Sequence, residues 1–177
     1  MVVYGSYGAG RVASRHKSAS GEPREMVVLD FAAGLSVTLP LERALEYLRP
    51  LAGETEMACV GTTLREGRTV IADGWLKRSK ATQTKVTAGQ TVGLAEVVRD
   101  SVGRDRPPAA PGKTTRLSPS EQQLYLKARQ LLADEIGLVR GIQSSEADDW
   151  ITDQLSHTPV KRSKPAIRPT PTAHIAQ

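Results

Sequence analysis

The sequence has few of the residues on which several protein classes depend. Its 177 residues include one cysteine, and aromatic residues make up 4% of the chain. A single cysteine, Cys59, excludes an internal disulfide framework and a zinc site built on cysteines, and we expect it to be a small core residue. No apolar run approaches the roughly 18 residues of a membrane span, and the start at Met1 lacks a signal-peptide pattern. We therefore expect a cytoplasmic protein with small, mainly aliphatic cores.

Patterns that would indicate catalysis or metal binding are also missing. His16, His157 and His174 lie far apart in the sequence, without the i, i+4 pairing or neighbouring carboxylate of a metal site. The glycines of residues 5–10 superficially resemble a phosphate-binding loop, but no Gly-Lys-Ser/Thr follows them, so a turn between strands is the better interpretation. We expect no enzymatic activity, no metal and no cofactor.

One segment of the sequence carries positive charge without any acidic residue. The formal net charge is +5 with a pI near 9.6, and no acidic residue occurs between Asp73 and Glu96. This segment contains Trp75 and four cations, namely Lys77, Arg78, Lys80 and Lys85. On a helix, such cations can reach phosphates, and a tryptophan can stack on or wedge against a base where a duplex opens. The alternative is that Trp75 is a core residue and the cations form a solvated surface.

The first 53 residues have the spacing of short strands separated by glycine-bearing turns. The expected strands span residues 2–4, 10–15, 24–31, 35–39 and 47–51. Five strands this short favour a small SH3-like or Tudor-like barrel over a sandwich, which needs two full inner faces. The strand at 35–39 alternates polar and apolar residues and is compatible with an edge position or an inner one.

From residue 54 onwards the apolar residues recur with a helical period. The expected helices span residues 54–66, 75–88 and 91–104, with a long helix after Ser118 and a last helix from Ser144 or Ser145. The clearest start is Ser118-Pro119-Ser120-Glu121, which combines a serine cap, a proline at the first helical position and a capping-box glutamate. The long helix carries an apolar stripe in which Glu135 is the exception.

These patterns predict an α+β chain in three parts. Residues 1–53 form the five-stranded β module, 54–157 an all-helical bundle, and 158–177 a disordered basic tail rich in proline. The proline-rich segment 107–116 is expected to be an exposed loop between two helices.

Several short segments, taken in order, resemble the CarD (CdnL) family of bacterial RNA polymerase-binding transcription regulators. In the β module they are Val3-Tyr4-Gly5, Val28-Leu29-Asp30-Phe31, Val37-Thr38-Leu39-Pro40 and Leu48-Arg49-Pro50-Leu51. In the helical part they are Leu94-Ala95-Glu96-Val97-Val98-Arg99-Asp100 and Leu117-Ser118-Pro119-Ser120-Glu121. Each segment is weak alone, but their order is specific.

The resemblance implies a role for each part. In that family a Tudor-like module binds the polymerase β subunit, partly by pairing an edge strand, and a tryptophan on a basic helix acts as a wedge at the upstream edge of the melted promoter. The implied polymerase contacts are Arg11, Arg15, Lys17, Ser36, Val37, Thr38 and Leu39. The implied DNA contacts are Trp75, Lys77, Arg78, Lys80 and Lys85. We accordingly expect a monomer that stabilises the open promoter complex and has no membrane partner.

Two positions depart from the family pattern. Thr38 and Gln122 stand where family members can carry basic residues, at the polymerase contact and at the start of the long helix respectively. A chain that binds polymerase as an adaptor, without significant DNA activity, is the alternative function.

Overall fold

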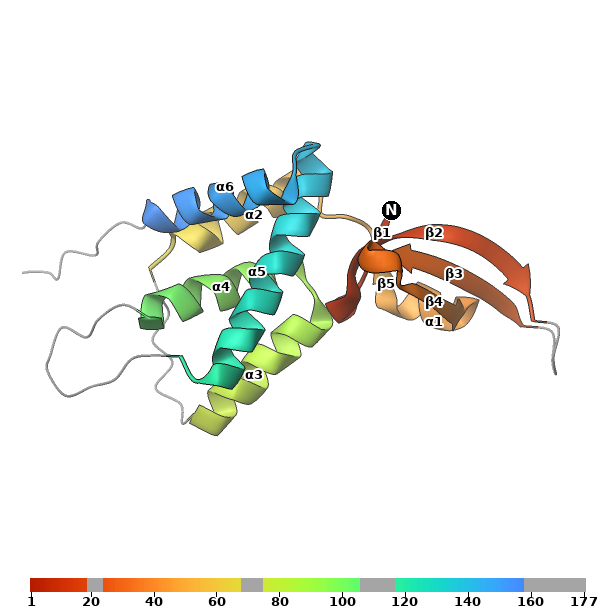
Figure 1. The fold of residues 1–177 in the computed structure, drawn as a ribbon, viewed down its shortest axis with the longest axis horizontal. Helices are drawn as coiled ribbons and strands as arrows, with labels where there is room; N and C mark the ends of the chain where they lie inside the picture. The colour runs from red at the N-terminus through yellow and green to blue at the C-terminus, as the bar shows by residue number, and fades with distance from the viewer. Residues whose placement is uncertain (19–23, 68–74, 106–116, 158–177) are drawn as a thin grey trace, which may run out of the picture.

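The N-terminal part is a curled antiparallel sheet of five strands. The computed structural model describes residues 1–18, 24–67, 75–105 and 117–157 (Figure 1). The strands are β1 (Val2–Tyr4), β2 (Gly8–Lys17), β3 (Glu25–Phe31), β4 (Ser36–Pro40) and β5 (Leu48–Arg49). Their order is β4-β3-β2-β1-β5, so β4 and β5 stand at the two ends. This half-barrel followed by helices confirms the expected fold class.

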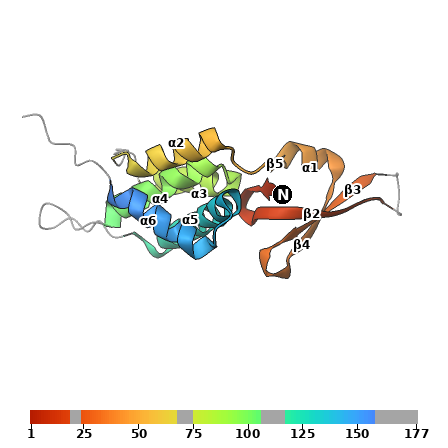
Figure 2. The ribbon, with the colours of Figure 1, turned by 90° about the horizontal axis from the view of Figure 1, so that it is seen from above.

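The helices form a bundle on one side of the sheet, as Figures 1 and 2 show. They are α2 (Glu54–Arg65), α3 (Trp75–Ala88), α4 (Thr91–Asp105), α5 (Pro119–Arg140) and α6 (Ser144–Ser156). The predicted loop at 107–116 and the predicted disordered tail lie outside the described residues.

The bundle has its own aliphatic core. Its fully buried side chains come from all five helices and include Val60, Leu64, Val86, Leu94, Val98, Leu132, Ile136 and Ile151. Cys59 is exposed, so its expected place in the core is wrong. The reason is helical phase, because Met57, Val60 and Leu64 take the inward positions of α2 and turn Cys59 outward.

One helix in the β module was not predicted. α1 (Leu41–Tyr47) follows Pro40 and shortens the strand expected at 47–51 to the two residues of β5. Its one buried residue is Ala44, which joins Val27, Leu29 and Phe31 in the sheet core. One buried position in seven residues gives no period from which a helix can be predicted.

Glycines allow two close approaches, one within the β module and one between that module and the bundle. The first turn is a 3-10 turn (η1, Gly5–Tyr7), whereas Gly8 and Gly10, expected among the turn residues, lie within β2. A Cβ on Gly10 would lie 2.7 Å from the ring of Phe31. Gly89 has φ +62°, and a Cβ there would lie 2.3 Å from the carbonyl oxygen of Gly5, so this glycine lets α3 end directly against η1.

The sheet and the bundle are joined by a buried ion pair. Arg49 of β5 donates to both carboxylate oxygens of Glu135 on α5, at 2.6 and 2.7 Å, and to the carbonyl oxygen of Gly89 at 2.6 Å. Glu135 also accepts from the backbone N–H of Ala52 at 3.0 Å and from the hydroxyl of Thr91 at 3.3 Å. Glu135 is 2% exposed and Arg49 is 16% exposed. The exception in the apolar stripe of α5 is therefore the anchor of the junction.

The predicted capping box of α5 is confirmed and extends into a second ion pair. The Ser118 hydroxyl accepts from the N–H of Glu121, whose carboxylate accepts from the N–H of Ser118 at 3.0 Å. Arg104 of α4 donates to the same carboxylate at 2.6 Å. Partial burial raises the pKa of Glu121, but the hydrogen bonds from Ser118 and the charge of Arg104 outweigh it, so the pKa is lowered overall.

The junction gives the first prediction. Arg49→Met leaves the buried Glu135 carboxylate without its cation and should lower the free energy of unfolding by about 3–5 kcal/mol. The double variant Arg49→Met/Glu135→Leu removes both charges and should recover about half of that loss. Urea unfolding followed by tryptophan fluorescence measures both. A single variant as stable as the wild type would show that the pair does not hold the two parts together.

Glu121 gives a prediction about pH. Because its pKa is lower in the folded chain, its ionised form stabilises the fold above the unfolded pKa, and this contribution is lost as pH falls through the folded pKa. Glu121→Gln should therefore destabilise the protein near pH 6 by about 1 kcal/mol and by much less near pH 3. Urea unfolding at both pH values tests this. The exposed Glu46→Gln is the control, and an equal loss at both pH values would contradict the assignment.

Candidate polymerase and nucleic-acid interfaces

β4 is an edge strand whose outer backbone groups can be identified. It pairs with β3 in the register Val37 to Leu29 and Thr38 to Val28. The N–H of Phe31 donates to the carbonyl of Leu35 at 2.8 Å, two positions beyond the Val37–Leu29 pair in that register. Hydrogen-bonded pairs alternate along an antiparallel ladder, so Val37 and Leu39 bond to β3 while the N–H and C=O groups of Ser36 and Thr38 point away from it. The sequence is compatible with either an edge or an inner position for this strand. The structure places it at the edge of the sheet.

The side chains of β4 follow the same alternation. Val37 and Leu39 are half-buried against the sheet core, and Ser36 and Thr38 are exposed. The Ser36 hydroxyl donates to Asp30 of β3 at 2.5 Å. An incoming strand would therefore find a rigid backbone edge flanked by short polar side chains.

The β2 cations predicted to contact polymerase lie two strands from this edge. Arg11, Arg15 and Lys17 are exposed on β2, about 10 Å from β4 at two strand spacings. Arg15 bonds to Glu25 of β3 at 2.5 Å, and that hydrogen bond lowers the pKa of the carboxyl. Arg11 lies 3.9 Å from Asp30. Both arginines therefore have acidic neighbours, and the local surface is less positive than the sequence alone indicates.

Trp75 lies at the start of α3 and is 48% exposed. The alternative that it is a core residue is therefore wrong. The next residue, Leu76, is 75% exposed. Two large apolar side chains thus face solvent at the beginning of a helix that contains no acidic residue.

The four cations of α3 lie on two different faces of the helix. Lys77 and Lys80 are exposed. Arg78 and Lys85 are half-buried and line a small hollow against α4, where Lys85 pairs with Glu96 at 2.7 Å. The structure thus brings Trp75, Lys77 and Lys80 onto solvent-facing surface and turns the other two predicted DNA contacts toward the bundle.

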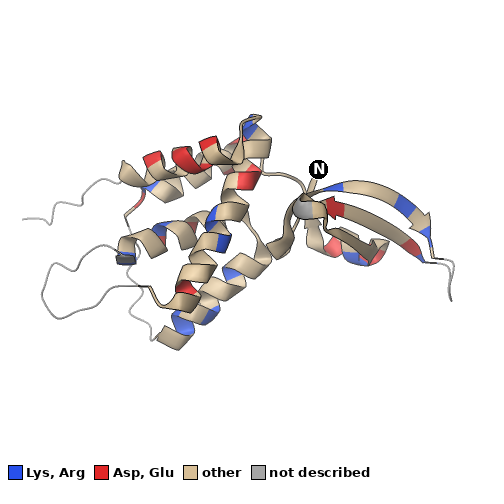
Figure 3. Ribbon diagram, in the orientation of Figure 1, with Lys and Arg blue, Asp and Glu red and all other residues tan. Residues whose placement is uncertain are grey.

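Charge is distributed unevenly over the bundle (Figure 3). α3 carries cations only, whereas α6 carries acidic residues and no cation. The acidic residues of α6 are Glu146, Asp148, Asp149 and Asp153. Asp148 bonds to Arg129 of α5, whose pKa is raised by that hydrogen bond. A polyanion is therefore attracted to the α3 side and repelled from the α6 side.

Comparison with known families assigns both parts of the chain. The CarD-like/TRCF RID domain matches residues 1–52, and the CarD C-terminal domain matches residues 59–152. The chain belongs to the CarD family. This confirms the resemblance carried by the short sequence segments, and it makes the protein a CarD-family regulator that interacts with RNA polymerase. Within the described residues, no helix of this CarD-family protein is both long and apolar enough to cross a membrane.

Sequence reasoning missed two features of the CarD-family protein. Arg49 was quoted only within a family segment, and its partner Glu135 is 86 residues away, so no local pattern joins them. Tyr7 and Tyr47 were not singled out, although the structure brings them to one groove beside α3. The Tyr4-to-Tyr7 spacing across a glycine turn was the available signal for that groove.

Proposed function

We propose that this protein binds the β subunit of RNA polymerase through β4, contacts promoter DNA through α3, and stabilises the open promoter complex. The observation that carries the DNA half is Trp75, which is exposed at the start of an acid-free helix beside Lys77 and Lys80. The outward backbone groups of β4 support the polymerase half. The family match supports a polymerase partner in general.

Stabilisation of the open complex requires only a difference in affinity between two promoter states. The lysines of α3 contact phosphates in closed and open DNA alike, and counterion release makes that contact favourable but unselective. Trp75 can stack on a base only where base pairs have opened. A factor that binds the open state more tightly shifts the equilibrium towards it by that difference.

The Arg49–Glu135 junction allows this difference in affinity between open and closed DNA to act at a promoter. Arg49 and Glu135 fix the sheet relative to the bundle, so β4 on polymerase holds Trp75 in one place relative to the DNA. A tethered, pre-oriented contact avoids much of the entropy cost of a separate binding event. Modest DNA affinity in the free protein is consequently enough for the function.

The DNA half predicts the effect of removing the wedge. Trp75→Ala should leave polymerase binding unchanged and shorten the lifetime of the open complex by about tenfold, since base–aromatic stacking contributes about 1–3 kcal/mol. Competitor-challenge measurements on a preformed polymerase–promoter complex give the lifetime. Trp75→Phe should retain most of the effect, and Leu126→Ala, an exposed apolar change on α5, should be neutral. An unchanged lifetime for Trp75→Ala would favour the adaptor function.

The polymerase half predicts the effect of blocking the strand edge. Thr38→Pro removes an outward N–H without removing a β4–β3 hydrogen bond, and it should weaken binding to the polymerase β subunit by about tenfold. Thr38→Val keeps the N–H and changes only the side chain, so it should bind normally. Surface plasmon resonance with the full chain measures both. Equal binding by the proline variant would exclude backbone pairing at this edge.

A further inference from the structure

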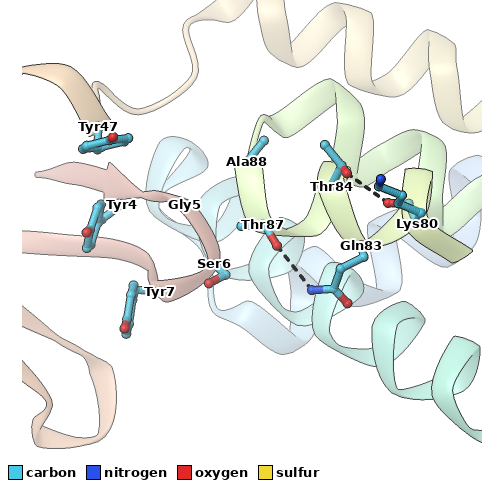
Figure 4. A pocket seen from close by; sticks show the side chains of 10 residues that line it. All are labelled: Tyr4, Gly5, Ser6, Tyr7, Tyr47, Lys80, Gln83, Thr84, Thr87 and Ala88. Carbon is cyan, nitrogen blue, oxygen red and sulfur yellow. Dashed lines mark hydrogen bonds between the residues drawn. The ribbon is translucent and has the colours of Figure 1, made fainter.

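A groove of about 690 Å³ runs between α3 and the first turn of the sheet (Figure 4). Its volume falls within the range of about 300–1,000 Å³ typical of sites for small organic ligands. One wall is made by Tyr4, Tyr7 and Tyr47, and the other by the face of α3 that contains Lys80 and Thr84. The polymerase contact at β4 does not account for this groove, because none of its lining residues belongs to that strand.

The sheet wall presents aromatic faces. Tyr4 and Tyr7 are stacked, with ring centroids 5.2 Å apart and planes 8° from parallel, and the ring of Phe31 lies 5.8 Å from Tyr7. Tyr7 is 52% exposed and Tyr47 is 50% exposed. Figure 4 shows the three tyrosines one after another along this wall, opposite α3. Half-exposed rings in a row are the feature with which proteins stack unpaired bases without reading their sequence.

The helix wall presents polar groups and one positive charge. Among the described residues that line the groove, Lys80 is the one with a charge and none is acidic. Gln83 donates to the hydroxyl of Thr87 at 3.3 Å, and Thr84 donates to the carbonyl of Lys80 at 2.9 Å. A ligand complementary to both walls has a flat aromatic part, polar edges and a negative charge.

The groove lies further along α3 than Trp75, and the first residue of that helix to line it is Lys80. Leu76 lies one turn before Lys80 on the same side of the helix, and Trp75 precedes it. The distance along the axis from Trp75 to Gln83 is about 12 Å, at about 1.5 Å per residue. This corresponds to roughly three or four nucleotides at the stacked spacing of about 3.4 Å.

We propose that this groove binds one unpaired nucleotide of the DNA strand that leaves the duplex at Trp75. Its base lies against Tyr7 and Tyr47, and its phosphate lies at Lys80. This proposal rests on the proposed function, since it takes Trp75 as the point where the strand separates. The protein thereby gains a second contact that exists only in opened DNA. Because the contact is made by stacking, any of the four bases can bind in the groove.

The test uses the full chain and a forked DNA whose single-stranded arm carries 2-aminopurine at one of the first six unpaired positions. Wild-type protein should change the fluorescence most about three or four nucleotides from the fork. Tyr7→Leu and Tyr47→Leu should each abolish that change and weaken fork binding by about tenfold, with affinity for blunt duplex unchanged. The matched control is Leu45→Ala, which alters an exposed apolar residue of α1 that does not line the groove. Thermal unfolding of each variant verifies that the fold is retained.

Three other results would overturn the proposal, and they are distinguishable. If both tyrosine variants bind the fork normally while Trp75→Ala weakens binding, DNA binding by α3 stands and the groove is not part of it. If wild-type protein binds neither fork nor duplex, even together with polymerase, the proposed function fails and the groove proposal fails with it. If free deoxynucleoside monophosphate binds as tightly as the fork, the occupant is a small molecule and not a promoter strand.

Discussion

The structure depends on one buried ion pair, Arg49 with Glu135. A carboxylate with 2% exposure would lose several kcal/mol of hydration without compensation. Here both of its oxygens accept from Arg49, one also accepts from the N–H of Ala52, and the other accepts from Thr91. The Nη2 group of Arg49, which bonds to Glu135, also donates to the carbonyl oxygen of Gly89. Arg49 belongs to β5, Ala52 to the connection into α2, and Glu135 to α5. Gly89 and Thr91 lie where α3 ends and α4 begins. This set of hydrogen bonds therefore joins four parts of the chain.

The arrangement of the two proposed interfaces follows from this junction. β5 pairs with β1, and β1 leads into η1, which contacts the end of α3 through Gly5 and Gly89. The position of α3 is thereby linked to the sheet through a short series of backbone contacts. β4 stands at the opposite end of the strand order. A partner that captures β4 consequently determines where the start of α3 can reach, which is the property that a polymerase-bound DNA contact needs.

The parts of this fold that the sequence predicts are those with a local signal. Regular apolar spacing located α4, and Ser118 with Glu121 located the start of α5, because both signals lie within a few residues. α1 escaped prediction because it buries only Ala44. Cys59 was assigned to the core by residue type, whereas the phase of α2 decides its position. The partner of Glu135 could not be found at all, since a contact across 86 residues leaves no local pattern.

Only some of the charged side chains of α3 face solvent, which is why counting charges in a sequence overestimates the size of a DNA interface. Five side chains of this helix were predicted to touch DNA, but a helix packed against neighbours on two sides presents only part of its circumference to solvent. Val86 faces the core, and Arg78 and Lys85 face α4, where Glu96 offsets the charge of Lys85. The surface that remains contains Trp75, Lys77 and Lys80, and Lys80 also lines the groove that contains the tyrosines. Under the proposed function, selectivity for opened DNA comes from the aromatic surface, because the lysines contribute attraction for any duplex.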